Sequence, residues 1–344
     1  MSRFRSLASL SIPDCMITTS KACLGTALLL ALAGCTSIKV HMGMKVYLAK
    51  IPVASIAVST ANGPGIAPGE KSPLVVAVTQ TNGKTLQTEG AGKGKVMWKD
   101  LKVTATVATV NQKGVLTLPK DPRISDGKLV HVSVAVPSHA DIHSAELDIP
   151  VRYNYAFVSN YSGSAGSSGM NGSDGMNGAS GSSGSMDPNN PSPGGNGGNG
   201  TDGSNGEDGG PGGNAPPVQV RIALRAGNHP LLQVGVSALG KDKLYLVDPQ
   251  GGSLTIKADG GPGGSGGRGG RGGSGGSGGM GTPSGSSGSS GSDGRSGFDG
   301  PPGKGGSITV TYDPQAKPYM TAIRLSNKGG PAPVFQEEPV APLW

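Results

Sequence analysis

The sequence predicts an all-β protein in which two β-rich regions carry two glycine-rich blocks, and three observations support this. First, apolar and polar residues alternate in short runs between 53 and 154, the period of a strand with one buried face. Second, glycine recurs at every third position through 163–213 and 260–306. Third, glycine makes up 62 of the 344 residues and aromatic residues 4%, so the apolar side chains available for a core lie mainly outside those blocks.

The first β-rich region, 53–158, is predicted to form an antiparallel sandwich. Short apolar-rich runs at 74–78, 101–107 and 130–136 are separated by turn signals such as Asn82-Gly83. About 100 residues are enough for a sandwich of two sheets.

The order of features in this region resembles that of bacterial Ig-like domains. These features are a turn at 66–70, Thr81-Asn82-Gly83-Lys84, Val96-Met97-Trp98 and Lys113-Gly114-Val115. The resemblance implies an Ig-like β-sandwich that positions other domains or binds a partner. Trp98 is expected to pack in or beside the core rather than to serve as a platform for a ligand.

The glycine-rich blocks contain four tracts, each about 20 residues long. They are tract 1 (163–184), tract 2 (194–212), tract 3 (260–281) and tract 4 (285–306). Period three matches polyproline II, which has three residues per turn and rises about 3.1 Å per residue, so each tract is expected to form a rod of roughly 60–70 Å. The breaks at 187–193 and 282–284 predict reversals, which would make each block a hairpin of two antiparallel rods.

Tract 3 is predicted to lie at the centre of a bundle of four rods. Each of its register glycines is followed by a second glycine, so two of its three faces carry no side chain. Tracts 1 and 4 have one bare face and are expected at the periphery, with tract 2 intermediate. The candidate packing column is Gly260, Gly263, Gly266, Gly269, Gly272, Gly275 and Gly278. The candidate surface contacts are Arg268, Arg271, Arg295 and Phe298.

Three arrangements of the tracts stay open from sequence. Cα–H groups of one rod can lie against carbonyls of another within a single chain, which resembles the glycine-rich polyproline II bundles of snow flea antifreeze proteins and of some phage tail-tip adhesins. A collagen-like homotrimer would use three chains, although proline is rare inside these tracts. A disordered spacer is the third, because glycine loses most backbone entropy on folding. A net charge of −5 on 163–213 and +2 on 260–306 favours pairing of the two blocks.

Short β segments flank both blocks, at 153–158, 218–224, 254–256 and 308–312. We expect the blocks to be insertions between strands of one sheet, which would bring both rod hairpins to the same end of it. The Pro-rich tail, 329–344, is expected to be extended and mobile.

The tetrad Leu32-Ala33-Gly34-Cys35 ends an apolar run at 22–32 that is too short to span a bilayer. It resembles the lipobox of bacterial lipoprotein signal peptides. The resemblance implies cleavage before Cys35 and acylation of that residue, so that a lipid bilayer is a partner of the mature chain.

In such lipoproteins, Asp directly after the acylated cysteine directs the protein to the inner membrane. This chain has Thr36 at that position, and in this it resembles the outer-membrane class. The expected location is therefore the outer membrane, with its periplasmic face and its cell-surface face both open. A signal that begins at Met1 and one that begins at Met16 are also both open.

Charge is distributed unevenly along the chain. Residues 35–160 contain 14 Lys and Arg against 8 Asp and Glu, a net +6, whereas residues 161–344 carry a net −1. The positive region beside the anchor favours contact with an anionic membrane surface. Nucleic acid is not expected as a partner, because aromatic and basic residues do not interleave. The other expected partner is an unidentified protein or glycan surface. The chain is expected to bind it as a monomer or as a homotrimer.

No catalytic, cofactor-binding or metal-binding constellation is expected, so the protein is predicted not to be an enzyme. The three cysteines are at positions 15, 23 and 35, and cleavage with acylation would leave no thiol. The segment His139-Ala140-Asp141-Ile142-His143 offers three metal ligands without a fourth and is expected to be a polar loop or strand end. Residues 197–205 begin like a calcium-binding nonapeptide, but no nine-residue repeat follows.

The predicted organisation has five segments. They are a signal peptide (1–34), an anchor and linker (35–52), the Ig-like β-sandwich (53–158), a β-sheet region with the glycine-rich blocks (159–328) and the Pro-rich tail (329–344). The expected function is that of a membrane-anchored lipoprotein acting as a structural or adhesive surface-binding module. A collagen-like trimeric stalk is the first alternative, and a disordered spacer or an ice-binding surface is the second.

Overall fold

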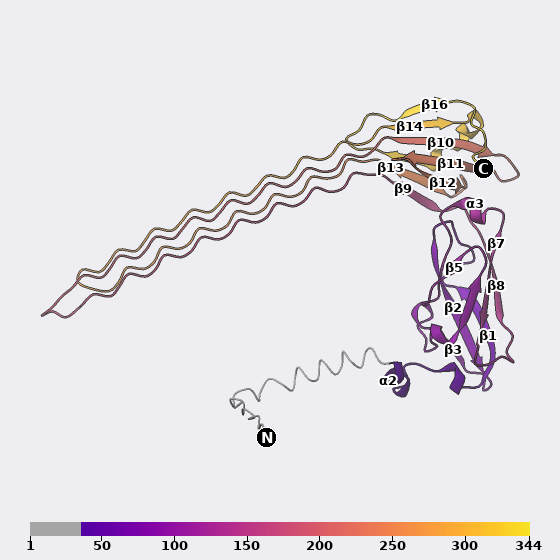
Figure 1. Ribbon diagram of the computed structural model, residues 1–344, viewed down its shortest axis with the longest axis horizontal. Coiled ribbons are helices and arrows are strands. Elements are labelled where there is room, and N and C mark those ends of the chain that lie inside the picture. The colour runs from indigo at the N-terminus through magenta and orange to yellow at the C-terminus, as the bar shows by residue number, and fades with distance from the viewer. Residues whose placement is uncertain (1–35) are drawn as a thin grey trace, which may run out of the picture. The chain divides into compact units, whose positions relative to one another are not determined.

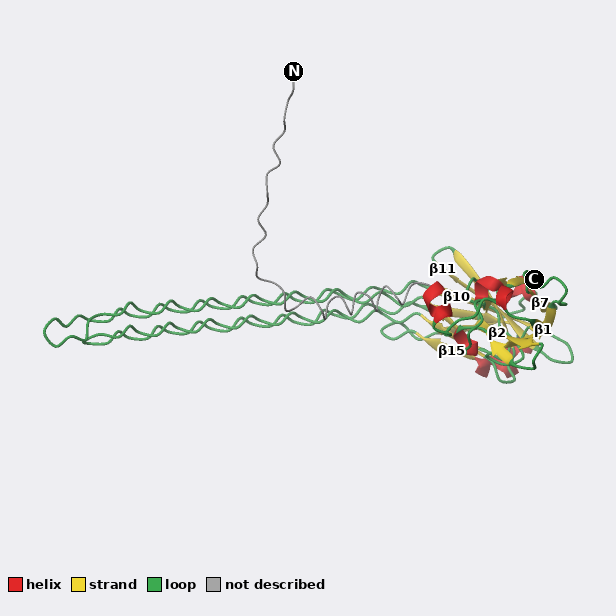
Figure 2. Cartoon of the chain, turned by 90° about the horizontal axis from the view of Figure 1, so that it is seen from below, coloured by secondary structure: helices red, strands yellow, loops and turns green. Residues whose placement is uncertain are grey.

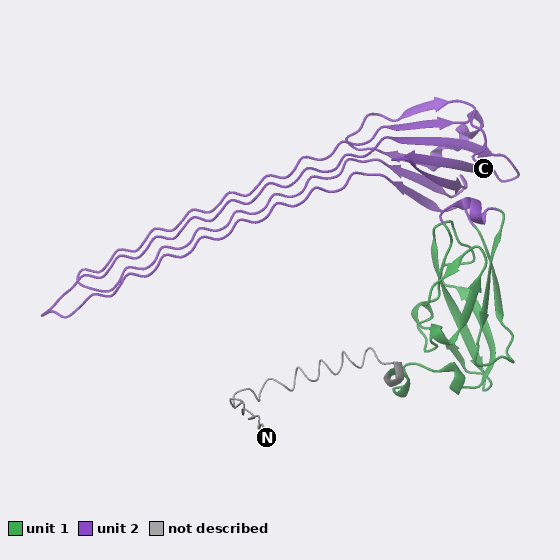
Figure 3. Cartoon of the chain, in the orientation of Figure 1, with its two compact units in different colours: residues 1–119, 127–151 green, residues 120–126, 152–344 purple. Residues whose placement is uncertain are grey.

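A computed structural model describes residues 36–344, and its β-strands and short helices confirm the all-β prediction. The chain divides into two compact units (Figure 3). Unit 1 comprises residues 1–119, of which 36 onward are described, and Gly127–Val151. Unit 2 comprises Lys120–Asp126 and Arg152–Trp344. Among the described residues, no helix has the length and apolar character needed to cross a bilayer. The predicted signal peptide and the tetrad Leu32, Ala33, Gly34 and Cys35 lie outside the described residues.

Unit 1 contains two antiparallel sheets. The first has the order β1 (Val53–Thr60), β2 (Lys71–Gln80), β6 (Val115–Thr117) and β5 (Thr109–Val110), with β3 (Thr85–Gln87) also paired to β2. The second has the order β4 (Lys102–Ala105), β7 (Leu129–Ala135) and β8 (Ala145–Pro150). The helical segments are α2 (Thr36–His41) and the single 3-10 turns η1 (Leu48–Lys50), η2 (Gly90–Gly92) and η3 (Trp98–Asp100).

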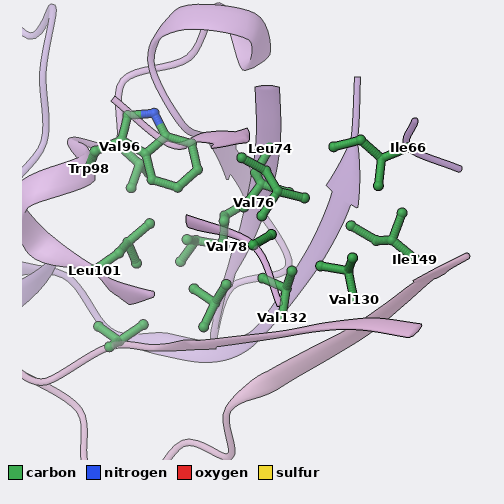
Figure 4. Packing of buried hydrophobic residues seen from close by; sticks show 14 of the residues in the cluster. Ile66, Leu74, Val76, Val78, Val96, Trp98, Leu101, Val130, Val132 and Ile149 are labelled. Atoms are coloured by element: carbon green, nitrogen blue, oxygen red, sulfur yellow. The ribbon is translucent and has the colours of Figure 1, made fainter. Parts of the chain in front are cut away.

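The core of unit 1 follows the period-two pattern of its strands. On β2, Leu74, Val76 and Val78 are buried in alternation with less buried neighbours, and β7 repeats this with Val130 and Val132 (Figure 4). Trp98 packs at the edge of this cluster with 6% of its surface exposed. Its indole Nε1 donates a hydrogen bond to the Glu89 carbonyl at 3.2 Å, which satisfies its polar atom. The expectation that Trp98 serves in core packing is therefore confirmed.

Unit 2 is also built from two sheets. The five-stranded sheet has the order β12 (Lys241–Val247), β11 (Leu231–Ala238), β10 (Val218–Arg225), β14 (Ile308–Tyr312) and β16 (Val334–Glu337). The three-stranded sheet has the order β15 (Ile323–Ser326), β13 (Ser253–Lys257) and β9 (Ala156–Asn160). Two helical segments, α3 (Pro122–Ser125) and η4 (Pro314–Ala322), complete the unit. The rings of Phe157 on β9 and Tyr245 on β12 lie 5.9 Å apart between centroids, which links the two sheets.

The strands that flank the glycine-rich blocks belong to two sheets, so the expectation of one sheet was wrong. β9 and β13 pair in parallel in the three-stranded sheet, and β10 and β14 pair in parallel in the five-stranded sheet. Tracts 1 and 3 therefore continue one sheet, while tracts 2 and 4 lead into the other. All four tracts nevertheless extend from the same end of the two sheets (Figure 1).

The tail is part of unit 2, and the expectation that it is mobile was wrong. Its strand β16 pairs in parallel with β14, and Val340 is 7% exposed. The side-chain amide of the buried Gln233 donates to the Trp344 carbonyl at 3.1 Å and accepts from the Leu343 N–H at 3.0 Å. A glutamine on β11 thus pairs with the backbone of Leu343 and Trp344, a contact that composition does not reveal.

The border between the units lies at Val151 and Arg152, whereas the sequence placed the end of the sandwich at 158. The strand β9, which the sequence placed at the end of the sandwich, pairs with β13 and belongs to unit 2. The short segment Lys120–Asp126 also belongs to unit 2, where the Asp126 carboxylate pairs with Arg225.

Candidate functional site: the glycine-rod bundle

The four glycine tracts form extended rods packed side by side over their whole length, here called rods 1 to 4 (Figures 1 and 2). Contacts between rods recur every third residue, as three residues per turn of polyproline II requires. Because polyproline II has no internal hydrogen bonds, the peptide groups of each rod must find partners on another rod or in water.

The register of the bundle is inherited from the sheets. Ala156 on β9 pairs with Ser253 on β13, 97 positions later, and rods 1 and 3 keep this offset in the side-chain contact of Asn171 with Arg268. Rods 2 and 4 keep the offset of 90 that pairs Val218 with Ile308. The strands therefore fix the alignment of rods that have no hydrophobic pattern to define it.

Backbone hydrogen bonds of 2.6–3.0 Å join five of the six rod pairs. Rod 1 donates to rod 3, rod 4 to rod 3, and rod 3 to rod 2, as in the bond from Gly270 N–H to the Ser204 carbonyl. Rod 2 donates both to rod 1 and to rod 4. Rods 2 and 3 thus each bond to the three other rods, whereas rods 1 and 4 each bond to two. Rod 3 is central, as the sequence predicted, but rod 2 is equally so.

The glycines of rod 3 occupy two faces, and both are closed by another rod. A Cβ on any residue of the candidate packing column would overlap a carbonyl oxygen of rod 4; this column is Gly260, Gly263, Gly266, Gly269, Gly272, Gly275 and Gly278. The glycine that follows each of them is more deeply buried, and a Cβ there would overlap a carbonyl oxygen of rod 1. This buried column is Gly261, Gly264, Gly267, Gly270, Gly273, Gly276 and Gly279. No larger residue fits either column without moving backbone.

Asparagine and aspartate side chains form a second set of contacts, which the sequence reasoning missed. Along rod 2, and at Asn214 just past its end, they recur at three-residue spacing, and each Oδ1 accepts a backbone N–H of rod 4 at 2.6–2.9 Å. This acceptor ladder is Asn196, Asn199, Asp202, Asn205, Asp208 and Asn214. On rod 1, Asn171, Asp174 and Asn177 accept from rod 3 in the same way at 2.8–2.9 Å.

Two of the exceptions in these ladders support the same pattern. Pro211 interrupts the ladder of rod 2, and the residue 90 positions later is Pro301, which has no N–H to donate. Ala165 stands in the corresponding row of rod 1, and the residue 97 positions later is Pro262. At these two positions the acceptor side chain is absent where the facing residue offers no donor, whereas Ser168, Ser180 and Ser183 in the row of rod 1 stand opposite residues that have an N–H. This spacing could have been read from the sequence once the two offsets were known.

The two glycine-rich blocks pack together as expected, but not through ion pairs. Within the described residues, ion pairs occur outside the rods, whereas Asp174, Asp202 and Asp208 accept backbone N–H groups. A carboxylate and an amide oxygen serve equally as acceptors, which explains why Asp and Asn alternate within one ladder.

The four candidate contact residues lie on the outside of the bundle. Arg268 and Arg271 are exposed on rod 3 beside the Asn and Asp residues of rod 1. Arg295 and Phe298 are exposed on rod 4 beside the ladder of rod 2, and 80% of the Phe298 surface is accessible. The structure therefore places these side chains beside two different rod contacts, that of rod 3 with rod 1 and that of rod 4 with rod 2.

The far end of the bundle has further apolar residues that the sequence reasoning did not select. Met186 and Met280 are 67% and 71% exposed there, next to the turn at 187–193. The Gly184 N–H donates to the Met280 carbonyl at 2.6 Å, so the two methionines belong to one tip. Exposed methionines adapt to varied apolar surfaces.

At the base of rod 3 lies Asp259, two positions after the end of β13 and directly before the rod. Its carboxylate accepts the Ser326 hydroxyl at 2.6 Å and the Lys328 N–H at 2.7 Å. The hydrogen bond from Ser326, followed by that from Lys328, holds the pKa of Asp259 below its ordinary value. The residue directly before rod 3 thus remains hydrogen-bonded to the segment 326–328 while it is ionised.

The segment 139–143 is a polar loop, one of the two forms that the sequence predicted for it. His139 Nε2 lies 2.9 Å from the Leu48 carbonyl, and the segment 139–143 forms turns and bends. In the described part of the chain, no group of three or more His, Cys, Asp and Glu side chains is arranged to hold a metal ion.

Comparison with known proteins adds no family to this picture. A scan of protein-family models, a search of curated proteins and a search of solved structures each found no match to the chain.

Proposed function

We propose that this protein is a membrane-anchored lipoprotein, located in the outer membrane, whose rod bundle is a structural or adhesive surface-binding module. Support for the anchor comes from the tetrad Leu32-Ala33-Gly34-Cys35, with Cys35 as the acylated residue. Support for the module comes from the rods.

The observation that carries the proposal is that the glycine faces and the acceptor side chains of the rods contact other rods of the bundle. Side chains that point outward are therefore not needed to hold the bundle together and can meet another surface. Arg268, Arg271, Arg295 and Phe298 are the proposed contacts, and the tip with Met186 and Met280 adds an apolar end. A protein or a glycan is the kind of partner that arginine and aromatic side chains bind.

The proposed role is binding or support rather than catalysis. The side chains exposed on the rods include arginine, serine, methionine and phenylalanine. Among the side-chain contacts of the described residues there, no base lies beside a nucleophile. We propose no cofactor for this protein.

The hydrogen bonds within the chain favour a monomeric bundle over a collagen-like trimer, because each buried glycine column already faces another rod of the same chain. They also favour an ordered module over a disordered spacer. An ice-binding surface would need a flat and regular array, and on rod 3 the serines alternate with Arg268 and Arg271. Sedimentation gives the mass that separates monomer from trimer.

Two measurements test the proposal. Cys35→Ser should abolish incorporation of labelled palmitate and release the protein from the outer-membrane fraction; unchanged labelling would reject the anchor. Binding of the purified chain to a glycan array and to whole cells should weaken in a variant with Arg268→Ser, Arg271→Ser and Phe298→Ser. The matched control is Lys84→Ser, an exposed change in unit 1. Equal binding by both variants would reject the rods as the contact surface.

A further inference from the structure

A pocket of about 610 Å³ opens in unit 1, next to the end of the core that contains Trp98. Its apolar wall includes Trp98, Leu101, Val103 and Val110, from η3, β4, β5 and the residue between η3 and β4. Figure 4 shows Trp98 and Leu101 on the same side of the core cluster. Sites for small molecules commonly have volumes of roughly 300–1,000 Å³ and apolar walls with a few polar groups.

The polar groups of the pocket are mainly cationic. Lys39, Lys45 and Lys99 line it, and Glu89 is the acidic residue among the lining side chains. Lys45 Nζ lies 2.8 Å from Glu89 Oε2. Lys99 Nζ lies 5.1 Å from the centre of the Tyr47 ring, which holds its ammonium group by a cation–π contact. The lining side chains therefore carry a net charge of +2.

Glu89 is already committed to partners of its own. Burial raises the pKa of this carboxyl, but the hydrogen bonds from Lys45 and from the Trp98 N–H, with the charges of Lys45 and Lys39, outweigh burial and leave the pKa below its ordinary value. The carboxylate consequently stays ionised and neutralises about one lysine. The ammonium groups of the other two are left to attract an anion.

We propose that this pocket binds an anionic phospholipid, with an acyl chain against the apolar wall and the phosphate between Lys39 and Lys99. A simple anion would leave the apolar wall without a partner, and a neutral apolar ligand would leave the charges of Lys39 and Lys99 without a counter-charge. A nucleotide would need an aromatic face for stacking, but Gly114 covers the Trp98 ring so closely that a Cβ there would overlap it. An amphiphile with one acyl chain and an anionic head satisfies both parts of the pocket.

The place of the pocket in the sequence agrees with a lipid ligand. Lys39 lies in α2, four residues after Cys35, about one helical turn. If Cys35 is acylated as proposed above, the pocket lies close to a bilayer. This one step depends on the proposed function, whereas the volume, the apolar wall and the lysines do not.

The test uses the full chain with Cys35→Ser, which prevents acylation, and Trp344→Phe, which leaves Trp98 as the fluorophore. The probe is a short-chain phosphatidylglycerol with brominated acyl chains, kept below its critical micelle concentration. Bromine quenches a tryptophan that it touches. We expect saturable quenching of Trp98, at least tenfold weaker binding of the matching phosphatidylcholine, and at least tenfold weaker binding after Lys39→Glu with Lys99→Glu.

Two further variants separate the pocket from general attraction by charge. Val110→Phe should abolish quenching because it fills the pocket while every charge is kept. Lys84→Glu removes a lysine from an exposed turn of unit 1 and should leave binding unchanged. Equal quenching by both lipids, no effect of Lys39→Glu with Lys99→Glu, or full displacement by an equal concentration of inorganic phosphate would each overturn the proposal. Because Cys35 is absent from this protein, such a result would leave the palmitate test of the anchor unaffected.

Discussion

The sandwich of unit 1 and the rod bundle of unit 2 differ in what fills their interiors, which is apolar side chains in the sandwich and backbone in the bundle. In the sandwich, Leu74, Leu116 and Val132 are fully buried, and side chains fill the space between the sheets. In the bundle, the buried column of rod 3 consists of glycine, so backbone packs directly on backbone. The sandwich is specified by where apolar side chains recur, and the bundle by where side chains are missing.

The two interiors also gain stability in different ways. Burial of apolar surface in the sandwich contributes roughly 25 cal/mol per Å². The bundle depends on many backbone hydrogen bonds, each with a net value of only about 0.5–1.5 kcal/mol, against the large entropy loss of glycine. Because one misplaced rod would break a whole row of such bonds, the fixed offsets set by β9 with β13 and β10 with β14 matter more than any single contact.

The largest effect is expected from making a core residue smaller. Leu116→Ala should lower the stability of unit 1 by about 2–5 kcal/mol, because the side chain is fully buried and leaves a cavity. Urea unfolding measures this, with Trp98 fluorescence in a Trp344→Phe background reporting on unit 1 and circular dichroism reporting on the rods. Met176→Ala on rod 1 removes a side chain of similar size that is 76% exposed, and should change stability by less than about 0.5 kcal/mol. Similar losses in both variants would show that side-chain volume stabilises the rods as much as it stabilises the sandwich.

The reverse change should damage only the bundle. Gly270→Ala places a Cβ against the Ser173 carbonyl of rod 1, and we expect a loss of about 1–3 kcal/mol with faster hydrogen exchange along the rods. Gly198→Ala is the matched control. Its Cβ would meet Ala179 N at 3.2 Å, and Thr201 and Ser204 already carry side chains in the same column, so this change should be nearly neutral. Equal damage by both alanines would show that rod packing is not selective for the buried column.

A smaller effect is expected in the acceptor ladder. Asn199→Ala removes the acceptor of the Ser289 N–H, which water replaces in part, so about 0.5–1 kcal/mol should be lost. Asn199→Asp should be nearly neutral, because Asp202 and Asp208 make the same bond on the same rod. Thermal unfolding of the rods by circular dichroism compares the variants. Ala165→Asn should add no stability, since Pro262 has no N–H; a clear gain there would contradict the ladder.

The smallest effect concerns pH and should be confined to the sandwich. His131 Nδ1 lies 2.7 Å from Asp148 Oδ1, and this hydrogen bond, with the charges of Asp148 and Glu146, raises the pKa of the histidine. The stability it contributes is present below the ordinary pKa of about 6.5 and is lost as pH rises through the raised value. Urea unfolding of unit 1 at pH 6 and pH 9 should show this loss, and His131→Gln should remove the dependence. A pH dependence that survives the substitution would assign it to other groups.

Much of this architecture could be predicted from the sequence, and the physical reason why it could be predicted differs between regions. The strands around Leu74 and Val132 were visible because burial of one face imposes period two. The rods were visible because close backbone contact imposes glycine at period three. The assignment of flanking strands to two sheets was not visible, since pairing partners 90 and 97 residues apart leave no local pattern. The binding of the tail by Gln233 was hidden for the same reason.

Within the candidate site, the glycine column from Gly260 and the exposed Arg268 and Phe298 could be selected from spacing alone. The equal role of rod 2 could not, because Thr201 and Ser204 make its second face look less bare than that of rod 3. Those side chains fit because their column lies on the outside of the bundle, a fact that only the packing reveals.

Amide hydrogen exchange in rod 2, resolved by residue with NMR, tests the packed bundle most directly. Gly200 N–H donates to the Ser289 carbonyl and Thr201 N–H to the Met176 carbonyl, both at 2.9 Å, whereas the described residues offer no acceptor to the N–H of Asp202. Exchange should therefore be slow at Gly200, slow at Thr201 and fast at Asp202. This order should repeat every third residue along the rod. Uniformly fast exchange from 194 to 212 would contradict the packed bundle and leave a flexible glycine chain in its place.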